Sequence, residues 1–280
     1  MWFMLSLLAG LLFAANKLIF RKVFTKDVHP IAFLSAHDSI AGLLLLPVAL
    51  FNLSYPHSTK TWLALIVGVL LIFVANLFAA LSLKYTEASI YQIVGQLRNV
   101  VTLIGGYILF NEAINLGKVV SIALVILGVI IAIKEKSRLQ LSKGVVYAFI
   151  SGITIALAFL FIKEATVDVK PAFSASLSLI VSGLLAYCLI TVKHERPAKL
   201  VPTEHRKQLL IAALIFAVFE LVLFTALNLG QASKVTPATQ SSMIFTLIGG
   251  YIFLHERNRI KQKLIGGGLV ALGIGLLLFV

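Results

Sequence analysis

The chain has 280 residues, of which 60% are apolar and only 12% are charged. Its mean hydropathy of +1.01 excludes an ordinary soluble domain, and its continuous apolar runs exclude an alternating β-barrel. The net charge of +13 lies mainly in short links between apolar runs, so it indicates the positive-inside bias of a membrane protein and argues against nucleic acid as a partner.

Ten apolar runs follow one another along the chain, and each is close to the roughly 20 residues that a helix needs to cross a bilayer. The sequence therefore predicts an all-α membrane protein with ten transmembrane helices. The first run starts without a basic segment before it, so we expect a retained span and not a cleaved signal peptide. The predicted helices cover residues 3–20, 31–51, 62–83, 89–110, 118–133, 144–162, 172–192, 208–229, 235–254 and 263–279.

The second half of the chain repeats the first at an offset of 144 residues. The segment TLIGGYI at 102–108 recurs at 246–252, and each copy is followed by an acidic residue, Glu112 and Glu256. We therefore predict two domains, residues 1–137 and residues 138–280, each a repeat of five helices. Because five is odd, the second repeat must enter the membrane from the opposite side, which is an inverted repeat. Both acids are expected to cap or pair across short links.

The cationic side chains are divided unevenly between the predicted links. Links after odd-numbered helices carry 17 Lys or Arg residues, whereas links after even-numbered helices carry five. The positive-inside rule places the odd links in the cytoplasm and both termini outside. We expect a multi-pass protein of the inner cell membrane.

In these repeated segments the chain resembles the EamA-type transporters of the drug/metabolite transporter superfamily. In that family the fourth and ninth helices start after a small Ala-Ser turn and end in an acidic residue, as at 88–89 and 232–233 here. The resemblance covers essentially the whole chain. It implies ten helices in two five-helix repeats and a secondary transporter, often an exporter, of amino acids or similar metabolites.

Polar side chains gather in the fourth predicted helix, where an ionisable group costs several kcal/mol unless it is paired or wetted. Arg98 lies deep in this helix, and its guanidinium is suited to a substrate carboxylate or phosphate. With Arg98, the polar residues cover about half of the helix surface, which we interpret as a cavity wall. These residues are Tyr91, Gln92, Gln96 and Asn99. The alternative is a structural ion pair between Arg98 and an acid on another helix.

Neutral partners for a substrate are expected on two other helices. Asn76 lies in the third predicted helix, and Thr239 and Gln240 lie in the ninth, across the pseudo-symmetric cavity from Arg98. The alternative for a threonine inside a membrane helix is a hydrogen bond to the preceding turn.

Three residues are candidates for proton coupling. Glu220 lies near the middle of the eighth predicted helix, where it could bind and release a proton or pair with Arg98. His37 and Asp38 lie early in the second helix and form the other candidate pair, and Asp38 could alternatively neutralise Lys17. Lys17 itself is expected to reach the membrane interface near the end of the first helix.

The predicted function is secondary active transport of a small metabolite, such as an amino acid or related organic anion, by alternating access and coupled to protons. We expect export, and a monomer or homodimer in the lipid bilayer. The alternative within transport is a multidrug exporter of cationic aromatic compounds, which would need Glu220 but not Arg98. A non-transporting membrane assembly or regulatory protein is the alternative from another class.

An intramembrane enzyme is not expected, because the sequence lacks a nucleophile–base pair, a metal-ligand motif and a phosphate-binding loop. For the same reason we expect neither a metal nor a cofactor.

Overall fold

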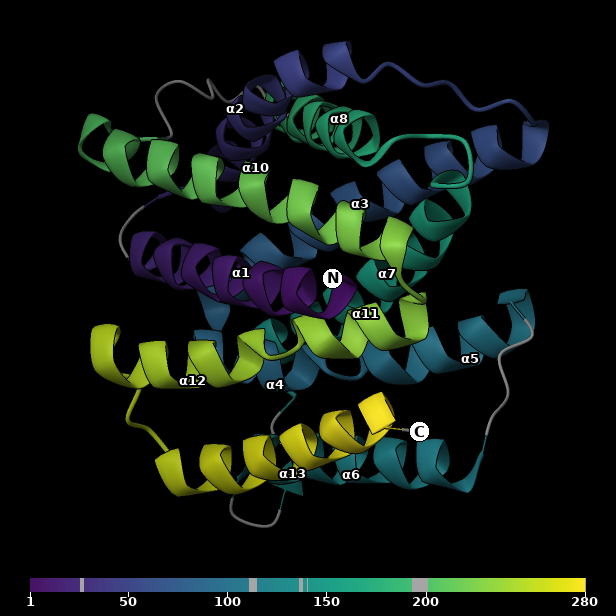
Figure 1. Ribbon diagram of the computed structural model, residues 1–280. Coiled ribbons are helices and arrows are strands. Elements are labelled where there is room, and N and C mark those ends of the chain that lie inside the picture. Colours follow the sequence, from purple (N-terminus) through teal and green to yellow (C-terminus); the bar gives the residue numbers. More distant parts are fainter. Residues whose placement is uncertain (26–27, 111–114, 136–137, 140, 193–200, 280) are drawn as a thin grey trace.

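Apolar sequence of this density can satisfy its backbone hydrogen-bonding groups in lipid only by forming helices. The computed structural model describes residues 1–25, 28–110, 115–135, 138–139, 141–192 and 201–279, and most of these are helical. The helices lie side by side in one bundle (Figure 1).

The described residues of the first half form six helices and one strand, with bounds as follows. They are α1 (Trp2–Phe24), α2 (Pro30–Phe51), α3 (Thr59–Tyr85), α4 (Ala88–Gly95), α5 (Arg98–Phe110), α6 (Leu116–Ile133) and β1 (Lys134–Glu135). The strand β1 pairs antiparallel with β2 (Arg138–Leu139) at the start of the second half.

The second half has a matching order of elements. They are α7 (Lys143–Ala165), α8 (Pro171–Val192), the 3-10 turn η1 (Thr203–His205), α10 (Arg206–Leu229), α11 (Ala232–Thr239), α12 (Ser242–Phe253) and α13 (Ile260–Phe279).

Capping residues decide where several helices begin. The Ser58 and Thr61 side chains form a capping box at the start of α3, and Ser142 accepts a hydrogen bond from the first turn of α7. Pro30 starts α2, at a position where its missing N–H costs no helical hydrogen bond.

Within the described residues, seven helices are long and apolar enough to cross a membrane, namely α1, α2, α3, α6, α7, α8 and α10 with η1. The all-helical membrane architecture agrees with the sequence prediction. The other three predicted spans correspond to α13 and to two pairs of shorter helices, α4–α5 and α11–α12.

These two pairs differ from the prediction, which expected one continuous helix at 89–110 and another at 235–254. In the first pair, the N–H groups of Gln96 and Leu97 bond to carbonyls three residues back, at 3.1 Å each, which ends α4. In the second pair, the Gln240 N–H bonds to the Pro237 carbonyl at 3.0 Å, and α12 starts anew at Ser242. The two interruptions are 144 residues apart, at Gln96 and Gln240.

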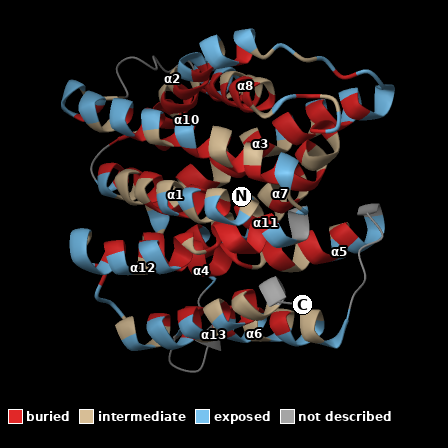
Figure 2. Cartoon of the chain, viewed as in Figure 1, coloured by how far each residue is buried: buried red, intermediate tan, exposed pale blue. Residues whose placement is uncertain are grey.

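Helices from the two halves pack against one another throughout the bundle. The most extensive pairs are α3 with α7, α2 with α8, α6 with α13, and α1 with α10. Glycine permits the close approach of α2 and α8, because a Cβ atom on Gly42 would lie 2.8 Å from the backbone nitrogen of Ile180. Burial is concentrated between the helices, and the outward faces carry exposed apolar side chains such as Leu43 and Leu214 (Figure 2).

Equivalent helices of the two halves end at opposite ends of the bundle. The α5 helix ends and α6 begins at one end, whereas α12 ends and α13 begins at the opposite end (Figure 1).

Between α7 and α8, Asp168 accepts hydrogen bonds from the His57 backbone N–H at 2.9 Å and from the Thr61 hydroxyl at 2.8 Å. These two bonds lower the pKa of Asp168 below its ordinary value.

Candidate functional site

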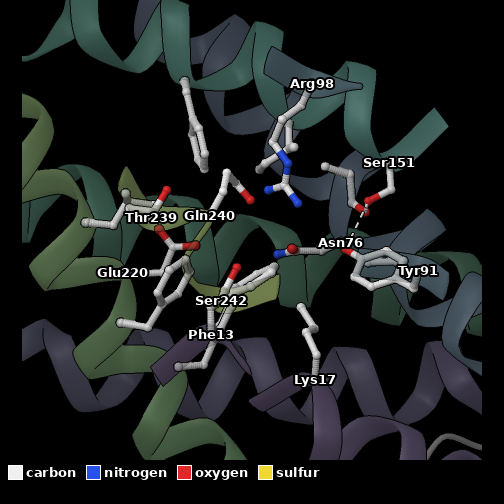
Figure 3. A pocket seen from close by; sticks show the side chains of 17 residues that line it. Phe13, Lys17, Asn76, Tyr91, Arg98, Ser151, Glu220, Thr239, Gln240 and Ser242 are labelled. Carbon is white, nitrogen blue, oxygen red and sulfur yellow. Dashed lines mark hydrogen bonds between the residues drawn. The ribbon is translucent and has the colours of Figure 1, made fainter. Parts of the chain in front are cut away.

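A buried cavity lies where the interruptions of the α4–α5 and α11–α12 pairs meet α1, α3, α7 and α10 (Figure 3). The cavity volume, taken as the space open to the centre of a water molecule, is about 30 Å³, which holds about two waters. A metabolite therefore does not fit until the walls move apart. The lining residues are Phe13, Lys17, Ala75, Asn76, Ala79, Tyr91, Arg98, Ser151, Ile155, Phe159, Phe216, Phe219, Glu220, Leu223, Thr239, Gln240 and Ser242.

Arg98 enters the cavity from the interruption between α4 and α5 (Figure 3). Its side chain is 4% exposed, and its Nε donates to the carbonyl of Gly95 at 2.8 Å. This bond takes up a carbonyl that the end of α4 leaves without a helical partner. Within the described residues the two terminal nitrogens make no hydrogen bond or ion pair, so the fork is free to bind a ligand.

Lys17 reaches the same cavity from α1 and is 2% exposed. Its Nζ lies 4.7 Å from the ring centre of Phe13, 5.0 Å from that of Phe216 and 5.1 Å from that of Phe20. Cation–π contacts of this kind stabilise a buried ammonium only partly. In the described part of the chain, Lys17 has no ion-pair partner within 4 Å.

Glu220 projects into the cavity from α10 and is also 2% exposed. Its Oε2 atom is buried without a hydrogen-bond partner among the described residues. The carboxylate interacts electrostatically with Lys17 and with Asp38 but forms no direct ion pair with Arg98. This conformation therefore contains no structural ion pair between Arg98 and Glu220.

Four of the predicted neutral residues also line the cavity, namely Asn76, Tyr91, Thr239 and Gln240. The Thr239 hydroxyl donates to the Thr236 carbonyl at 2.7 Å, as expected for a threonine that bonds the preceding turn. The Gln240 Oε1 atom has no hydrogen-bond partner in the described structure, and so it can accept a bond from a ligand.

The structure does not bring Gln92, Gln96 and Asn99 into the cavity lining. All three are buried. Gln92 donates to Thr246 of α12 at 3.3 Å, Gln96 to the Gln92 carbonyl at 3.0 Å, and Asn99 to Gln96 at 3.3 Å. The prediction placed these residues on the polar surface of one continuous helix. That surface does not form, because the helix is interrupted between α4 and α5. Substrate contact by these three residues remains a prediction.

His37 and Asp38 lie beside the cavity in a fully buried network. The His37 Nδ1 and Asp38 Oδ1 atoms are 2.7 Å apart. The other oxygen of Asp38 accepts bonds from Ser182 of α8 at 2.5 Å and from Asn76 of α3 at 3.2 Å. Asn76 therefore joins this network to the cavity that contains Glu220.

Sequence reasoning missed Lys17 as a cavity residue. The prediction ended the first helix at residue 20, but α1 continues to Phe24, and so Lys17 lies about 10 Å from the helix end. The charges of Arg21 and Lys22 ended the apolar run without ending the helix. One signal was available, since Phe13 and Phe20 stand four residues before and three residues after Lys17 and share its face.

Glu256 closes one end of the bundle, in agreement with the expected capping role. Its carboxylate accepts bonds from the N–H groups of Ala88 (2.8 Å) and Ser89 (3.1 Å) and from the Ser89 hydroxyl (2.6 Å). It thereby caps α4, whose own N-cap residue makes no side-chain cap. Arg21 Nε lies 3.8 Å from the same carboxylate. We call Arg21, Ser89 and Glu256 the Glu256 cluster. The equivalent acid, Glu112, lies outside the described residues.

Two further contacts hold this end of the bundle together. Lys263 of α13 forms an ion pair with Glu87 and donates to the Glu256 carbonyl at 3.2 Å. The link that carries Glu256 contains two non-glycine residues with positive φ, His255 at 54° and Arg259 at 50°. Such a backbone is costly and persists only where the surrounding contacts hold it.

Replacing Glu256 with glutamine is expected to lower the free energy of unfolding by about 1.5–3 kcal/mol, because hydrogen bonds to a charged acceptor contribute about that much. The matched control is Glu204→Gln, an exposed acid on η1, which should change stability by less than about 0.5 kcal/mol. Denaturant unfolding in detergent micelles measures both. Equal stability of the two variants would show that Glu256 does not hold this end closed.

Comparisons with known proteins agree with the membrane architecture. The model of the EamA-like transporter family matches residues 1–134 and 142–279. An uncharacterized transporter of Archaeoglobus fulgidus is 27% identical over 269 residues, which cover 94% of this chain and 92% of the relative. The uncharacterized transporter YvbV of Bacillus subtilis is 25% identical over 236 residues, which cover 81% of this chain and 75% of the relative.

One solved crystal structure has the same fold. It superposes with a TM-score of 0.70 at 12% sequence identity, over 97% of this chain and 95% of its own.

Proposed function

From the premise that this chain belongs to the EamA-like transporter family, and is therefore a multi-pass membrane transporter, we propose that it exports amino acids or related organic anions. Transport would proceed by alternating access and would be coupled to protons. A transporter of this kind acts on a small molecule in a lipid bilayer and, in our proposal, resides in the inner cell membrane.

The observation that carries the substrate class is the set of three buried charges around one cavity. Arg98 and Lys17 are cations without ion-pair partners in the described chain, and Glu220 has an unbonded oxygen. Buried charges of this kind are costly until a ligand of opposite charge satisfies them. A substrate carboxylate suits the two cations, and a substrate ammonium suits Glu220.

The rest of the lining suits the remainder of such a molecule. The rings of Phe13, Phe159, Phe216 and Phe219 provide an apolar wall, against which an amino-acid side chain can pack. Asn76 and Gln240 offer neutral hydrogen bonds at the cavity edge.

We further propose ten membrane crossings, with residues 1–137 and 138–280 as inverted repeats. Reciprocal contacts support this arrangement. The Ser35 hydroxyl donates to the Gly183 carbonyl at 2.9 Å, and Ser176 donates to the Gly42 carbonyl at 2.9 Å. The C-terminal ends of α5 and α12, which lie at opposite ends of the bundle, also support it (Figure 1).

A second reciprocal pair concerns the helix ends. Arg21 of α1 donates to the Leu83 carbonyl of α3 at 2.9 Å, and Lys163 of α7 donates to the Leu227 carbonyl of α10 at 2.6 Å. In our proposal these cations close opposite faces of the membrane. The Glu256 cluster then shuts the cytoplasmic face in this conformation and must open for a substrate to enter from that side.

For the proton we propose Glu220 as the carrier. One of its oxygens is free of hydrogen bonds, whereas the Asp38 carboxylate is in contact with His37, Ser182 and Asn76. The three donors occupy the Asp38 carboxylate, whereas the unbonded oxygen of Glu220 is open to a new partner in the cavity, so Glu220 is the better placed of the two.

Uptake of radiolabelled amino acids and organic acids into proteoliposomes with an imposed proton gradient tests the proposal. Glu220→Gln is expected to remove the response to the gradient, while exchange of organic anions, which lack an ammonium group for Glu220 to bind, continues without a gradient. The control is Glu164→Gln, since Glu164 pairs with exposed Lys60 at the surface. A full gradient response in Glu220→Gln would contradict the coupling role, and a lack of uptake of every compound would contradict the substrate class.

The multidrug alternative has one supporting observation, the aromatic rings beside Glu220, which suit a cationic aromatic compound. It predicts that Arg98 is dispensable, and the same assay with a fluorescent aromatic cation decides between the two. The non-transporting alternative does not suit a chain whose family and relatives are transporters.

A further inference from the structure

Asn16 of α1 is a buried polar residue that neither the cavity lining nor the substrate proposal uses. It is 0% exposed. Its amide nitrogen lies 3.1 Å from the Ala212 carbonyl of α10 and 3.0 Å from Nε2 of His37. One side chain therefore joins α1, α2 and α10 at the inner end of the His37–Asp38 network.

The Ala212 carbonyl fixes which way the Asn16 amide points. A carbonyl only accepts hydrogen bonds, so the group facing it must be the Asn16 nitrogen. Turning the amide over would place its oxygen 3.1 Å from the carbonyl oxygen, acceptor against acceptor. The observed orientation is kept although it leaves the Asn16 Oδ1 atom buried without a partner.

This orientation determines the state of the His37 ring. The second N–H of the Asn16 amide points to Nε2, so this nitrogen must accept and carries no proton. The proton of the neutral ring is then on Nδ1, which donates to Asp38 Oδ1 at 2.7 Å. The rings of Phe20 and Phe216, with centres 4.7 Å and 5.0 Å from that of His37, cover the imidazole and exclude water.

We propose that Asn16 is a positioning residue that keeps Nε2 of His37 free of a proton, and that it ties proton binding there to the contact between α1 and α10. If α1 moves away from Ala212, the amide is free to turn and offer its oxygen to Nε2. Nε2 then takes up one proton from a hydronium ion of the entering solvent, which releases a water molecule, and the ring becomes an imidazolium while Nδ1–H continues to bond Asp38.

The charged groups that face this pair come from two neighbouring helices. They are Lys17 on α1 and Glu220 on α10, both of which interact electrostatically with Asp38. Asn76 of α3 and Ser182 of α8 reach Asp38 without adding charge. Proton uptake at His37 would change the net charge of the His37–Asp38 pair from −1 to 0 and so weaken the attraction between this pair and Lys17.

The consequence for transport rests on the proposed function. The α1 and α10 helices both line the cavity, and so their relative movement is what alternating access requires. Asn16 would then allow His37 to bind a proton only when these helices are apart.

Nitrogen-15 NMR of the protein in lipid bilayers tests the proposal without any substrate or gradient. Ala36-His37 is the only Ala-His step among the six histidines, so carbonyl-¹³C alanine with ¹⁵N histidine identifies His37. At pH 7 the wild-type ring should show a protonated Nδ1 and a bare Nε2. In Asn16→Asp, which replaces the amide donor by an acceptor of the same shape, both nitrogens should carry protons.

Ser35→Ala is the control, because it removes a buried hydrogen bond from α2 without touching the ring, and it should leave the His37 signals unchanged. A protonated Nε2 in the wild-type protein would overturn the proposal even if Asn16→Asp does not fold. Unchanged ring signals in folded Asn16→Asp would also overturn it. A failure of transport in proteoliposomes would remove the function proposed above and leave this result standing.

Discussion

Transport by Arg98→Ala is expected to fall by about 30-fold or more relative to wild type. Removing one partner of a buried, hydrogen-bonded charge pair costs about 2–5 kcal/mol, and in the proposed complex the substrate carboxylate would lose its main partner. Lys17 stays in the cavity but cannot replace the planar fork that binds a carboxylate with two parallel bonds. Initial uptake rates in proteoliposomes, over a range of substrate concentrations, measure the loss.

Two variants make this result specific. Arg98→Lys keeps the charge without the fork, and we expect it to retain part of the affinity for substrate. Arg206→Ala removes an exposed arginine at the start of α10 and should transport normally. If Arg98→Ala transported at the wild-type rate while Glu220→Gln did not, the multidrug alternative would be favoured and the anion proposal would be wrong.

Asp38→Ala is expected to lower the free energy of unfolding by about 3 kcal/mol or more, because each buried donor left without an acceptor costs about 1–3 kcal/mol. Asp38 is 0% exposed. Its loss would leave three buried donors without their acceptor, on His37, Ser182 and Asn76. Reversible unfolding in detergent micelles measures the change.

Glu220→Ala is the matched control, because Glu220 is the other buried carboxylate that the described helices bring to this region. Glu220 has an unbonded oxygen, so its removal leaves fewer groups unsatisfied and should cost less stability than Asp38→Ala. The reverse order would mean that the Asp38 network is not the more important of the two for folding.

The sequence by itself determined the class of the protein and much of its plan. Hydropathy located the seven long apolar helices of the described chain, because the bilayer requires about 20 apolar residues for each crossing whatever the helix packs against. The repeat of 102–108 at 246–252 indicated the two halves. The depth of Arg98 and Glu220 within apolar runs marked both as cavity candidates, because such positions are costly without a function.

Only the tertiary structure decided which polar residues face the cavity and which do not. The interruptions near Gln96 and Gln240 depend on local backbone hydrogen bonds and on Arg98 bonding to Gly95, and helical periodicity cannot anticipate a change of direction within a run. Lys17 entered the cavity because α1 continues past its apolar residues. The contacts of Asn16 with His37 and Ala212 join residues 21 and 196 positions apart, and such contacts exist only once the helices have packed.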